Sequence, residues 1–367
     1  MEKEERIAVL MPSFRGGGAE RVLVEFANWA VSRGVTTDLL VINDVGPYRS
    51  EVDKAVNIIA FDSVRSIYAV PAYVSYLRRA SPSGVVSTIG QLNIINSFLT
   101  PIFSKGTKVV LREANTPTQQ AKKKNSHKFK LLLKLYKRAY QSADSVIAVS
   151  RGVLDDVSAR YKIRKNLLLI PNPASVDSVR CKAAEPVNLS YLGLEDGDEF
   201  AIAVGRLTYQ KDFSTLIKAF RIIANSNDSI KLLILGEGEL RECLEREIEV
   251  LDLKKRVLLP GFVSNPFAVM RHARLLVMSS LYEGMPNVLL QGMALDLPIV
   301  STDCKSGPNE LLNNSLLEKL VSVGSANEIA VAVTDILSVK GKPDYSTRLS
   351  KMTPDIVFNQ YLNALIK

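Results

Sequence analysis

A chain of 367 residues exceeds what one hydrophobic core usually supports, so two domains of ordinary size are expected. Hydrophobic residues make up 47% of the chain and charged residues 23%, which is typical of a globular protein and excludes a disordered or collagen-like one. The formal net charge of +9 favours partners that carry phosphate, but it does not choose among nucleotides, nucleic acids and anionic lipids.

The start of the chain and its cysteines predict a protein that stays in the cytoplasm. Residues 1–6 mix acidic and basic side chains and lack the apolar core of about 7–15 residues that a secretory signal requires. No run approaches the roughly 20 apolar residues of a membrane-spanning helix. Cys181, Cys243 and Cys304 are odd in number and far apart, which argues against a disulfide framework or a metal site.

The first half of the chain alternates short apolar runs with helical patterns. An apolar run of strand length followed by a helical pattern is the repeating unit of a parallel sheet that is buried on both faces. The predicted strands are Ile7–Met11, Leu39–Ile42, Val85–Thr88, Val109–Arg112 and Val146–Ser150.

The pattern restarts in the second half, so a second sheet of the same kind is expected. Leu168–Pro173 and the weakly periodic residues 183–198 separate the two series and form the predicted linker. The last helical pattern, Asp355–Ile366, could pack on either domain. The predicted strands of this half are Phe200–Val204, Leu232–Leu235, Val257–Leu259, Leu275–Met278 and Ile299–Ser301.

These patterns predict an α/β protein with two doubly wound parallel sheets. We expect one domain at residues 1–174, a second at residues 175–352, and a C-terminal helix at residues 353–367 that could cross back to the first. In such folds ligands bind at the carboxyl ends of the strands, where the strand order reverses.

A glycine cluster, Gly16–Gly18, is the first candidate for ligand binding. It follows a predicted strand and precedes a helix, so its backbone N–H groups could approach an anion that the helix dipole favours. A tight strand-to-helix turn is the alternative, because an isolated glycine cluster is a weak signal. The helix that follows has one apolar face, with Val22, Leu23, Phe26 and Ala30.

Two cations, Arg206 and Lys211, follow the strand at Phe200–Val204. At the carboxyl end of a strand they could converge on a diphosphate and neutralise it as a leaving group. The alternative is an exposed loop that carries two unrelated charges.

The third candidate begins at Tyr282 and follows the strand Leu275–Met278. Pro286 suits the first turn of a helix, which places the Glu283 carboxylate just outside that helix and Gln291 about two turns along. The free N–H groups of residues 285–288 can hold a phosphate. Glu283 could also be an ordinary N-terminal capping acid.

Together these motifs resemble glycosyltransferase family 4, the retaining enzymes of the GT-B architecture. The resemblance covers nearly the whole chain, and it depends on the joint order and spacing of motifs that are each weak alone. The motifs are Gly17–Arg21, Ser142–Ser150, Ile170–Pro173, Gly205-Arg206-x4-Lys211, Leu235–Gly238, Pro260–Val263, Glu283–Pro286 and Ser306–Glu310.

The resemblance implies two Rossmann-like domains that face a central cleft. It assigns Arg206 and Lys211 to the donor diphosphate, Glu283 to the donor sugar, and the main chain of Phe262 and Val263 to the base. Arg206, Lys211 and Glu283 are the expected catalytic residues. The residues expected to bind the donor are Gly16, Gly17, Gly18, Gly205, Gly236, Phe262, Val263, Gly284, Met285, Pro286, Asn287, Val288 and Gln291.

Two positions depart from the family pattern. Gln291 replaces the second acid of the Glu-x7-Glu signature. Its amide oxygen can still accept a hydrogen bond from a ribose hydroxyl, but this bond lacks the added strength that the charge of a carboxylate would give. Ala114 stands where the family often has a histidine near the reacting sugar, between the expected acceptor-side residues Arg112, Glu113 and Asn115. The family mechanism needs no protein nucleophile, because the departing phosphate accepts the proton of the acceptor.

The segment Lys122–Arg138 is the strongest charge feature of the chain. Its helical part interleaves apolar residues with lysines, as helices at membrane surfaces do, so we expect contact with an anionic membrane. A surface helix that packs its apolar stripe on the core is the alternative. Nucleic acid is disfavoured, because no stacking motif accompanies the charge.

The sequence therefore predicts a retaining transferase for a hexose or N-acetylhexosamine. The favoured donor is a UDP-sugar, and the expected acceptor is lipid-linked or a glycan in bacterial surface polysaccharide assembly, at the inner face of the cell membrane. No metal is required, although magnesium is compatible with the motifs. The alternatives are a nucleotide-sugar 2-epimerase and, because of Gln291, a non-catalytic binding subunit.

Overall fold

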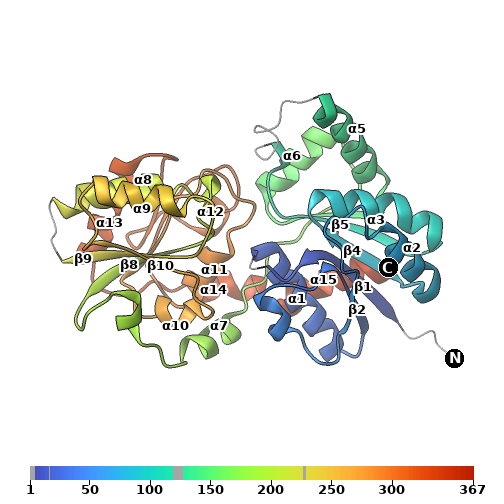
Figure 1. The fold of residues 1–367 in the computed structure, drawn as a ribbon, viewed down its shortest axis with the longest axis horizontal. Coiled ribbons are helices and arrows are strands. Elements are labelled where there is room, and N and C mark those ends of the chain that lie inside the picture. Colours follow the sequence, from blue (N-terminus) through green and yellow to red (C-terminus); the bar gives the residue numbers. More distant parts are fainter. Residues whose placement is uncertain (1–4, 16, 119–126, 226–228) are drawn as a thin grey trace. The chain divides into compact units, whose positions relative to one another are not determined.

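A computed structural model gives the structure of the chain, and it describes residues 5–15, 17–118, 127–225 and 229–367. The chain divides into two compact units (Figure 1). The N-terminal unit comprises Met1–Pro173 with Pro354–Lys367, and the C-terminal unit comprises Ala174–Thr353. Each unit contains a parallel sheet covered by helices, which confirms the predicted α/β class.

The N-terminal unit contains, in its described part, a seven-stranded parallel sheet in the order β3-β2-β1-β4-β5-β6-β7. The chain runs outward from β1 in one direction and from β4 in the other, so the strand order reverses between these two neighbours. The strands are β1 (Arg6–Ser13), β2 (Thr36–Asn43), β3 (Asn57–Ala60), β4 (Gly84–Thr88), β5 (Lys108–Glu113), β6 (Ser145–Ala148) and β7 (Leu167–Leu169).

The helices of this unit lie on both faces of the sheet. α1 contacts α15, which also contacts β4 and β5, whereas α2, α3 and α5 follow one another on the opposite face (Figure 1). The predicted apolar face of α1 is buried, as its spacing indicated. The helices are α1 (Gly18–Ser32), α2 (Val70–Ala80), α3 (Gly90–Phe103), α5 (His127–Ser142), α6 (Arg151–Tyr161) and α15 (Pro354–Ile366), with the short 3-10 helix η1 (Pro47–Glu51).

The described residues of the C-terminal unit form a six-stranded parallel sheet in the order β10-β9-β8-β11-β12-β13. Here the order reverses between β8 and β11, which are direct neighbours. The strands are β8 (Glu199–Val204), β9 (Ile230–Leu235), β10 (Val257–Gly261), β11 (Leu275–Met278), β12 (Ile299–Thr302) and β13 (Glu318–Val321).

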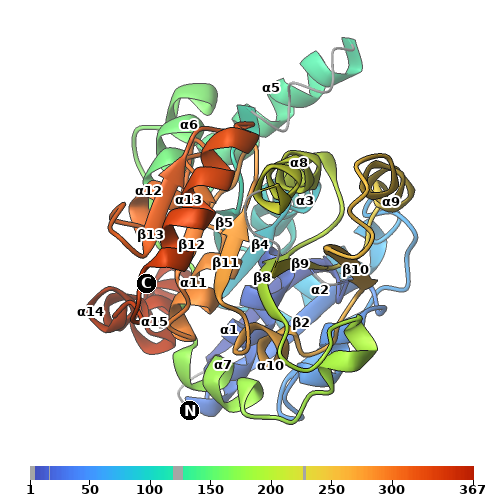
Figure 2. The same cartoon turned by 90° about the vertical axis from the view of Figure 1, so that its left-hand side faces the viewer.

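Helices α8, α9 and α13 cover one face of this second sheet, and α7, α10 and α11 lie on the other (Figure 2). The helices are α7 (Val176–Ala183), α8 (Phe213–Ala224), α9 (Arg241–Val250), α10 (Pro266–Met270), α11 (Asn287–Ala294), α12 (Pro308–Leu311), α13 (Ala326–Ser338) and α14 (Ser346–Leu349), with the 3-10 helices η2 (Leu189–Leu192), η3 (Tyr209–Lys211) and η4 (Ser350–Met352).

Three strands of the structure were not predicted from the sequence. β3 and β13 are edge strands of four residues, and β7 is an edge strand of three, so none carries a long apolar run. Leu168 and Leu169 of β7 lay in the predicted linker, but they pair with β6. Residues 183–198 are not the boundary between the units either, because the chain enters the C-terminal unit at Ala174.

An aromatic cluster joins α15 to α1 within the N-terminal unit. The Phe358 ring lies 5.5 Å from that of Phe26 and 5.8 Å from that of Trp29, between ring centroids. Tyr361 packs against Phe26 at 5.4 Å. Phe358 is 1% exposed, so this cluster buries much of the apolar face by which α15 is held.

We expect Phe358→Ala to lower the free energy of unfolding of the N-terminal unit by about 3–5 kcal/mol, because the substitution opens a cavity between two helices. Chemical denaturation followed by tryptophan fluorescence measures the change, since Trp29 belongs to the cluster. Asn363→Ala is the control on the same helix, because Asn363 is exposed. Equal stability of the two variants would contradict this role of α15.

Candidate functional site

The candidate site of the C-terminal unit lies where the strand order reverses. Gly205 follows β8 directly, and Glu283 comes five residues after the end of β11. Since β8 and β11 are parallel neighbours, both segments leave the sheet at its carboxyl edge. Two motifs that are 72 residues apart in the chain thus meet in one place.

Lys211 and Glu283 form the central ion pair of this site, with 2.6 Å between Nζ and Oε1. The side chain of Glu283 is 9% exposed and that of Lys211 is 20% exposed. The Ser280 hydroxyl donates to the same carboxylate oxygen at 2.7 Å, and the Gln210 amide donates to the other at 3.3 Å. Three donors therefore hold the Glu283 carboxylate in one orientation.

Main-chain contacts join the two loops around this pair. The Leu281 N–H donates to the Gln210 carbonyl at 2.8 Å, and the Ser279 hydroxyl donates to the Lys211 carbonyl at 2.7 Å. A Cβ atom at Gly236, where φ is +146°, would lie 2.0 Å from the Gly205 carbonyl oxygen. Only glycine allows the backbone after β9 to approach the backbone after β8 so closely.

Arg206 differs from Lys211 although both lie on the loop after β8. Its side chain is exposed, and it has no hydrogen bond or ion pair with any residue that the structure describes. Lys211 is engaged with Glu283 in the same structure. Arg206 is therefore the cation of this loop that is free to bind an incoming anion.

Helix α11 begins one residue later than the sequence predicts. Pro286 is its N-cap, with φ −77° and ψ 107°, and Asn287 is its first residue. Gln291 is therefore the fifth residue of α11, about one turn inside the helix. The first N–H groups of a helix have no partner within it, and the helix dipole favours an anion there. Gly284, Met285 and the half-buried Val288 surround this helix start.

The residues expected near the base follow β10. Phe262 is 57% exposed and Val263 is half-buried, so both are accessible in the C-terminal unit. Gly261, with φ +99°, precedes them, and a Cβ atom there would lie 2.7 Å from Glu237 Oε1. A contact with the base stays a prediction for Phe262 and Val263.

At the start of α1, Gly17 is the N-cap and Gly18 is the first residue. Gly16 lies outside the described residues. A Cβ atom on Gly17 would lie 2.0 Å from Oε2 of Glu20, so this carboxylate folds over the helix start. A phosphate that approached α1 here would meet a negative charge, which weakens the predicted role of these glycines.

Arg112 lies inside the N-terminal unit with 0% exposure. Its Nε donates to the Tyr361 hydroxyl at 2.8 Å and its Nη2 donates to Asn172 Oδ1 at 2.7 Å. The side chain thus braces β5 against α15 and has no surface to offer an acceptor. An acceptor contact stays a prediction for Glu113 and Asn115.

Glu113 ends β5 and is 8% exposed. The Tyr140 hydroxyl donates to its Oε2 at 2.5 Å, and the Asn93 amide donates to the Tyr140 hydroxyl at 2.8 Å. Burial raises the pKa of Glu113 to about 7, although the Tyr140 hydroxyl, the Asn115 N–H and the Arg112 charge all lower it. Tyr140 and Asn93 were missed from sequence, because they lie on α5 and α3 and carry no motif.

The basic segment is described only in part. Residues 122–126 and the side chains of residues 127–132 lie outside the described part of the chain. Farther along α5, Lys134, Leu135 and Arg138 are exposed, whereas Tyr140 is buried. Among the described helices, none has the length and apolar character needed to cross a bilayer.

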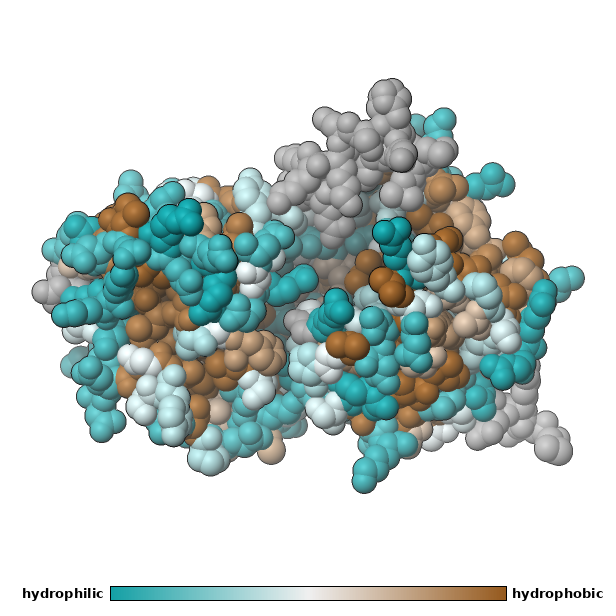
Figure 3. Space-filling view, in the orientation of Figure 1, coloured by the Kyte–Doolittle hydropathy of each residue, from teal (hydrophilic) through white to brown (hydrophobic). Residues whose placement is uncertain are grey.

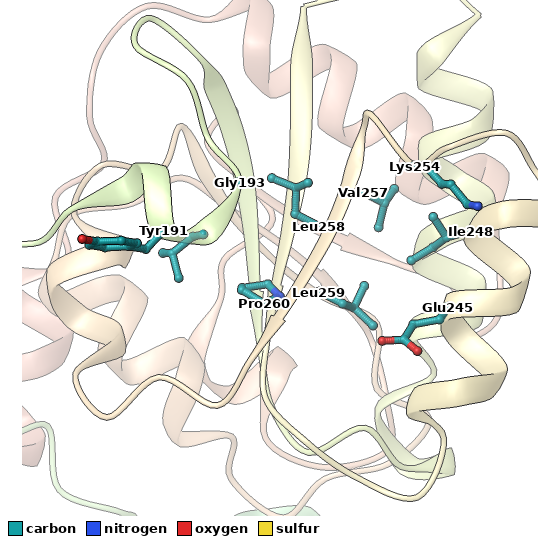
Figure 4. A pocket seen from close by; sticks show the side chains of 10 residues that line it. Tyr191, Gly193, Glu245, Ile248, Lys254, Val257, Leu258, Leu259 and Pro260 are labelled. Carbon is teal, nitrogen blue, oxygen red and sulfur yellow. The ribbon is translucent and has the colours of Figure 1, made fainter.

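A shallow pocket of about 450 Å³ lies at the β10 edge of the second sheet (Figure 4). Apolar residues gather on this face of the molecule below α9 (Figure 3). Tyr191 and Glu245 stand on opposite sides of the pocket, and Leu258 and Leu259 lie between them. It is separate from the Lys211–Glu283 pair, whose residues do not line it.

No group of three or more His, Cys, Asp or Glu side chains within the described ranges is placed to hold a metal ion. Cys304 is buried, whereas Cys181 and Cys243 are exposed.

The fold and the site define a class of protein. Two parallel α/β units, each with a reversal of strand order, and a cation–carboxylate pair beside a helix start are features of GT-B glycosyltransferases. The model of glycosyl transferases group 1 matches residues 189–352, and the model of glycosyltransferase family 4 matches residues 16–178. The chain belongs to the group 1 glycosyltransferases of family 4.

Relatives and solved structures agree with this assignment. An uncharacterized glycosyltransferase of Methanocaldococcus jannaschii is 34% identical to this chain over 210 residues. The matched segment is 57% of this chain and about half (51%) of that relative. The N-acetylgalactosamine-N,N'-diacetylbacillosaminyl-diphospho-undecaprenol 4-alpha-N-acetylgalactosaminyltransferase of Campylobacter jejuni is 28% identical over 89% of this chain and 88% of its own.

The protein in the crystal structure of Anabaena HepE in complex with UDP shares 17% sequence identity with this chain. The structural superposition covers 98% of each chain and has a TM-score of 0.79. This likeness supports the GT-B fold. The epimerase alternative finds no support among these proteins.

We expect Glu113→Gln to stabilise the protein at pH 8 but not at pH 5. Since the pKa of Glu113 is raised from 4.5 to about 7 in the folded state, folding binds a proton between these values, and stability is lost as the pH rises through this window. At pH 8 the ionisation of Glu113 lowers the free energy of unfolding by up to about 3 kcal/mol, and the Glu113→Gln variant avoids this loss.

Thermal unfolding at both pH values measures the difference, with the exposed Glu242→Gln as control. The same change in stability at pH 5 and pH 8 would show that Glu113 does not titrate in this range.

Proposed function

We propose that this protein is a retaining glycosyltransferase that uses a UDP-sugar as donor. The observation that carries the proposal is the Lys211–Glu283 pair at the start of α11, with the exposed Arg206 on the adjoining loop. A diphosphate needs cations and N–H donors, and a hexose hydroxyl needs a fixed carboxylate, and these groups stand together here. The Anabaena relative of known structure was crystallised with UDP, and also with UDP-glucose, which supports the choice of base.

The reaction proposed is a substitution at the anomeric carbon with retention. The bond from this carbon to the distal phosphate oxygen breaks, and the acceptor hydroxyl forms the new bond on the same face. The hydroxyl proton passes to the departing phosphate oxygen, so no protein base is needed. Arg206 and the α11 amides stabilise the negative charge that grows on this phosphate, while Lys211 holds Glu283 in position to bind the hexose.

A lipid-linked or glycan acceptor is the proposed second substrate, in bacterial surface polysaccharide assembly. The Campylobacter jejuni relative bears a name that specifies a diphospho-undecaprenol substrate, which supports an acceptor at a membrane. The exposed Lys134 and Arg138 on α5 support peripheral contact with an anionic leaflet, and we propose that it is the inner one. A resident metal has no part in this proposal, and magnesium that arrives with the nucleotide is compatible with it.

We expect Glu283→Gln to lower turnover at least about 100-fold while UDP binds within a few-fold of wild type, because the lost contact is to the sugar. Arg206→Gln should raise the Kd for UDP about 10- to 100-fold, through loss of a charge-assisted bond of about 1.5–3 kcal/mol. UDP release with a panel of UDP-sugars and lipid-diphosphate acceptors measures the first effect, and calorimetry the second.

Arg221→Gln, on the exposed side of α8, makes the same change of charge away from the site and is the control. Full turnover by Glu283→Gln would remove the role assigned to this carboxylate. If wild type releases UDP from no donor and binds none, the proposal fails as a whole.

We expect the double variant Lys134→Glu/Arg138→Glu to lose affinity for vesicles that contain phosphatidylglycerol. Each basic residue near anionic lipid contributes about 1 kcal/mol, so removal of two lowers the partition coefficient at least about 30-fold. Cosedimentation measures it, with phosphatidylcholine vesicles for comparison. Lys340→Glu/Lys342→Glu, at exposed positions of the other unit, matches the change of charge. Equal losses in both double variants would refute a specific role for α5.

A further inference from the structure

Strand β10 contains a bulge close to its carboxyl end. Between two residue pairs of the ladder, β10 carries one residue more than β9. Pro260 lies in this bulge and has no N–H group to offer the ladder. A bulge bends a strand and redirects the residues that follow it, which here are Phe262 and Val263. The pairs that flank the bulge are Leu258 with Leu233 and Gly261 with Leu235.

The side chain of Arg241, the first residue of α9, holds this bulge. Its Nη2 donates to the Leu259 carbonyl at 2.9 Å, inside the bulge. Its Nη1 donates to Glu237 Oε1 at 2.7 Å, and its Nε lies 2.9 Å from Glu245 Oε1. One planar guanidinium thus joins β10, the loop after β9 and helix α9. The ammonium group of a lysine does not reproduce this fixed arrangement of donors.

The loop after β9 connects this contact to the proposed donor site. The Gly236 N–H donates to the Gly261 carbonyl at 2.8 Å, and the Leu207 N–H donates to the Glu237 carbonyl at 2.9 Å. Leu207 directly follows Arg206, the exposed cation of the loop after β8. The carboxyl ends of β10, β9 and β8 are therefore held together by hydrogen bonds.

An exposed aromatic residue follows the bulge at this same edge of the sheet. Phe262 comes directly after β10, and β9 lies between β10 and β8. Two strand spacings, about 10 Å, thus separate the two strand ends. An accessible ring and main chain at one strand end, with a cation after the other, suit the planar base and the phosphates of one nucleotide.

We propose that Arg241 is a positioning residue that directs Phe262 and Val263 toward the base of the donor nucleotide. This inference rests on the proposed donor site and adds to it a residue that acts indirectly. Without the guanidinium the bulge loses its contact at the Leu259 carbonyl, and the segment after it is no longer held in one conformation. Arg241 then sets the affinity for the nucleoside, which the donor retains unchanged in the ground state and the transition state.

The test measures UDP and UMP binding by calorimetry, and turnover of the UDP-sugar that wild type uses, in Arg241→Gln. The Kd values for UDP and UMP should rise by the same factor, about 5- to 20-fold, because both nucleotides carry the base. The KM should rise with them while kcat stays within about twofold, since the lost binding is equal in both states. A merely structural defect would instead lower the active fraction, and so kcat, at an unchanged Kd.

Arg241→Lys keeps the charge but not the planar guanidinium, so it should weaken binding in the same way as Arg241→Gln. Arg246→Gln is the matched control, because it removes the same charge from an exposed position of α9. It should leave the Kd, KM and kcat unchanged. Glu237→Ala breaks the contact from its other side, and it decides by the same criteria if Arg241→Gln does not fold.

Three results would count against the inference. A Kd for UDP within about twofold of wild type in Arg241→Gln would overturn it, while the donor site itself would stand. A loss of affinity for UDP without one for UMP would place the effect at the distal phosphate and refute the assignment to the base. If wild type binds no UDP, the donor site fails, and this inference fails with it.

Discussion

The ion pair between Lys211 and Glu283 is the contact on which the candidate site depends. It joins a loop after β8 to a loop after β11, and with Ser280 it fixes the carboxylate at a place that water hardly reaches. Removing one partner would leave the other charge buried and unpaired, which costs far more than the pair contributes. The pair is therefore a constraint on geometry, and the free cation Arg206 and the start of α11 are arranged around it.

Both units keep imperfectly satisfied groups at the carboxyl edges of their sheets. In the C-terminal unit it is the Ser306 hydroxyl, and in the N-terminal unit it is the Thr88 hydroxyl at the end of β4. Burial also raises the pKa of Glu113, at the end of β5, to about 7. Other polar side chains near these edges are paired, as in the network from Asn93 through Tyr140 to Glu113. A buried polar group without a partner lowers the stability of a protein, so a water molecule or a ligand at such a group would be stabilising.

Much of the fold was readable from local pattern. The ten predicted strands were found because a strand covered on both faces must be apolar throughout, whereas the short edge strands β3, β7 and β13 face water and carry no such run. The site motifs were readable for a similar reason, because glycines and charges that follow a buried strand come at fixed distances along the chain. The start of α11 was misplaced by one residue, since Pro286 suits the N-cap as well as the first turn.

By itself the sequence determined the two α/β units and the family, because these depend on periodicity and on short motifs. Tertiary structure alone decided that α15 returns to the N-terminal unit, since its apolar face could have matched either sheet. It also decided that Arg112 donates a hydrogen bond to the hydroxyl of Tyr361, which lies 249 residues away, and that the Tyr140 hydroxyl donates one to Glu113. Such contacts join residues that are far apart in the chain, and only the packing of side chains in three dimensions selects the partner.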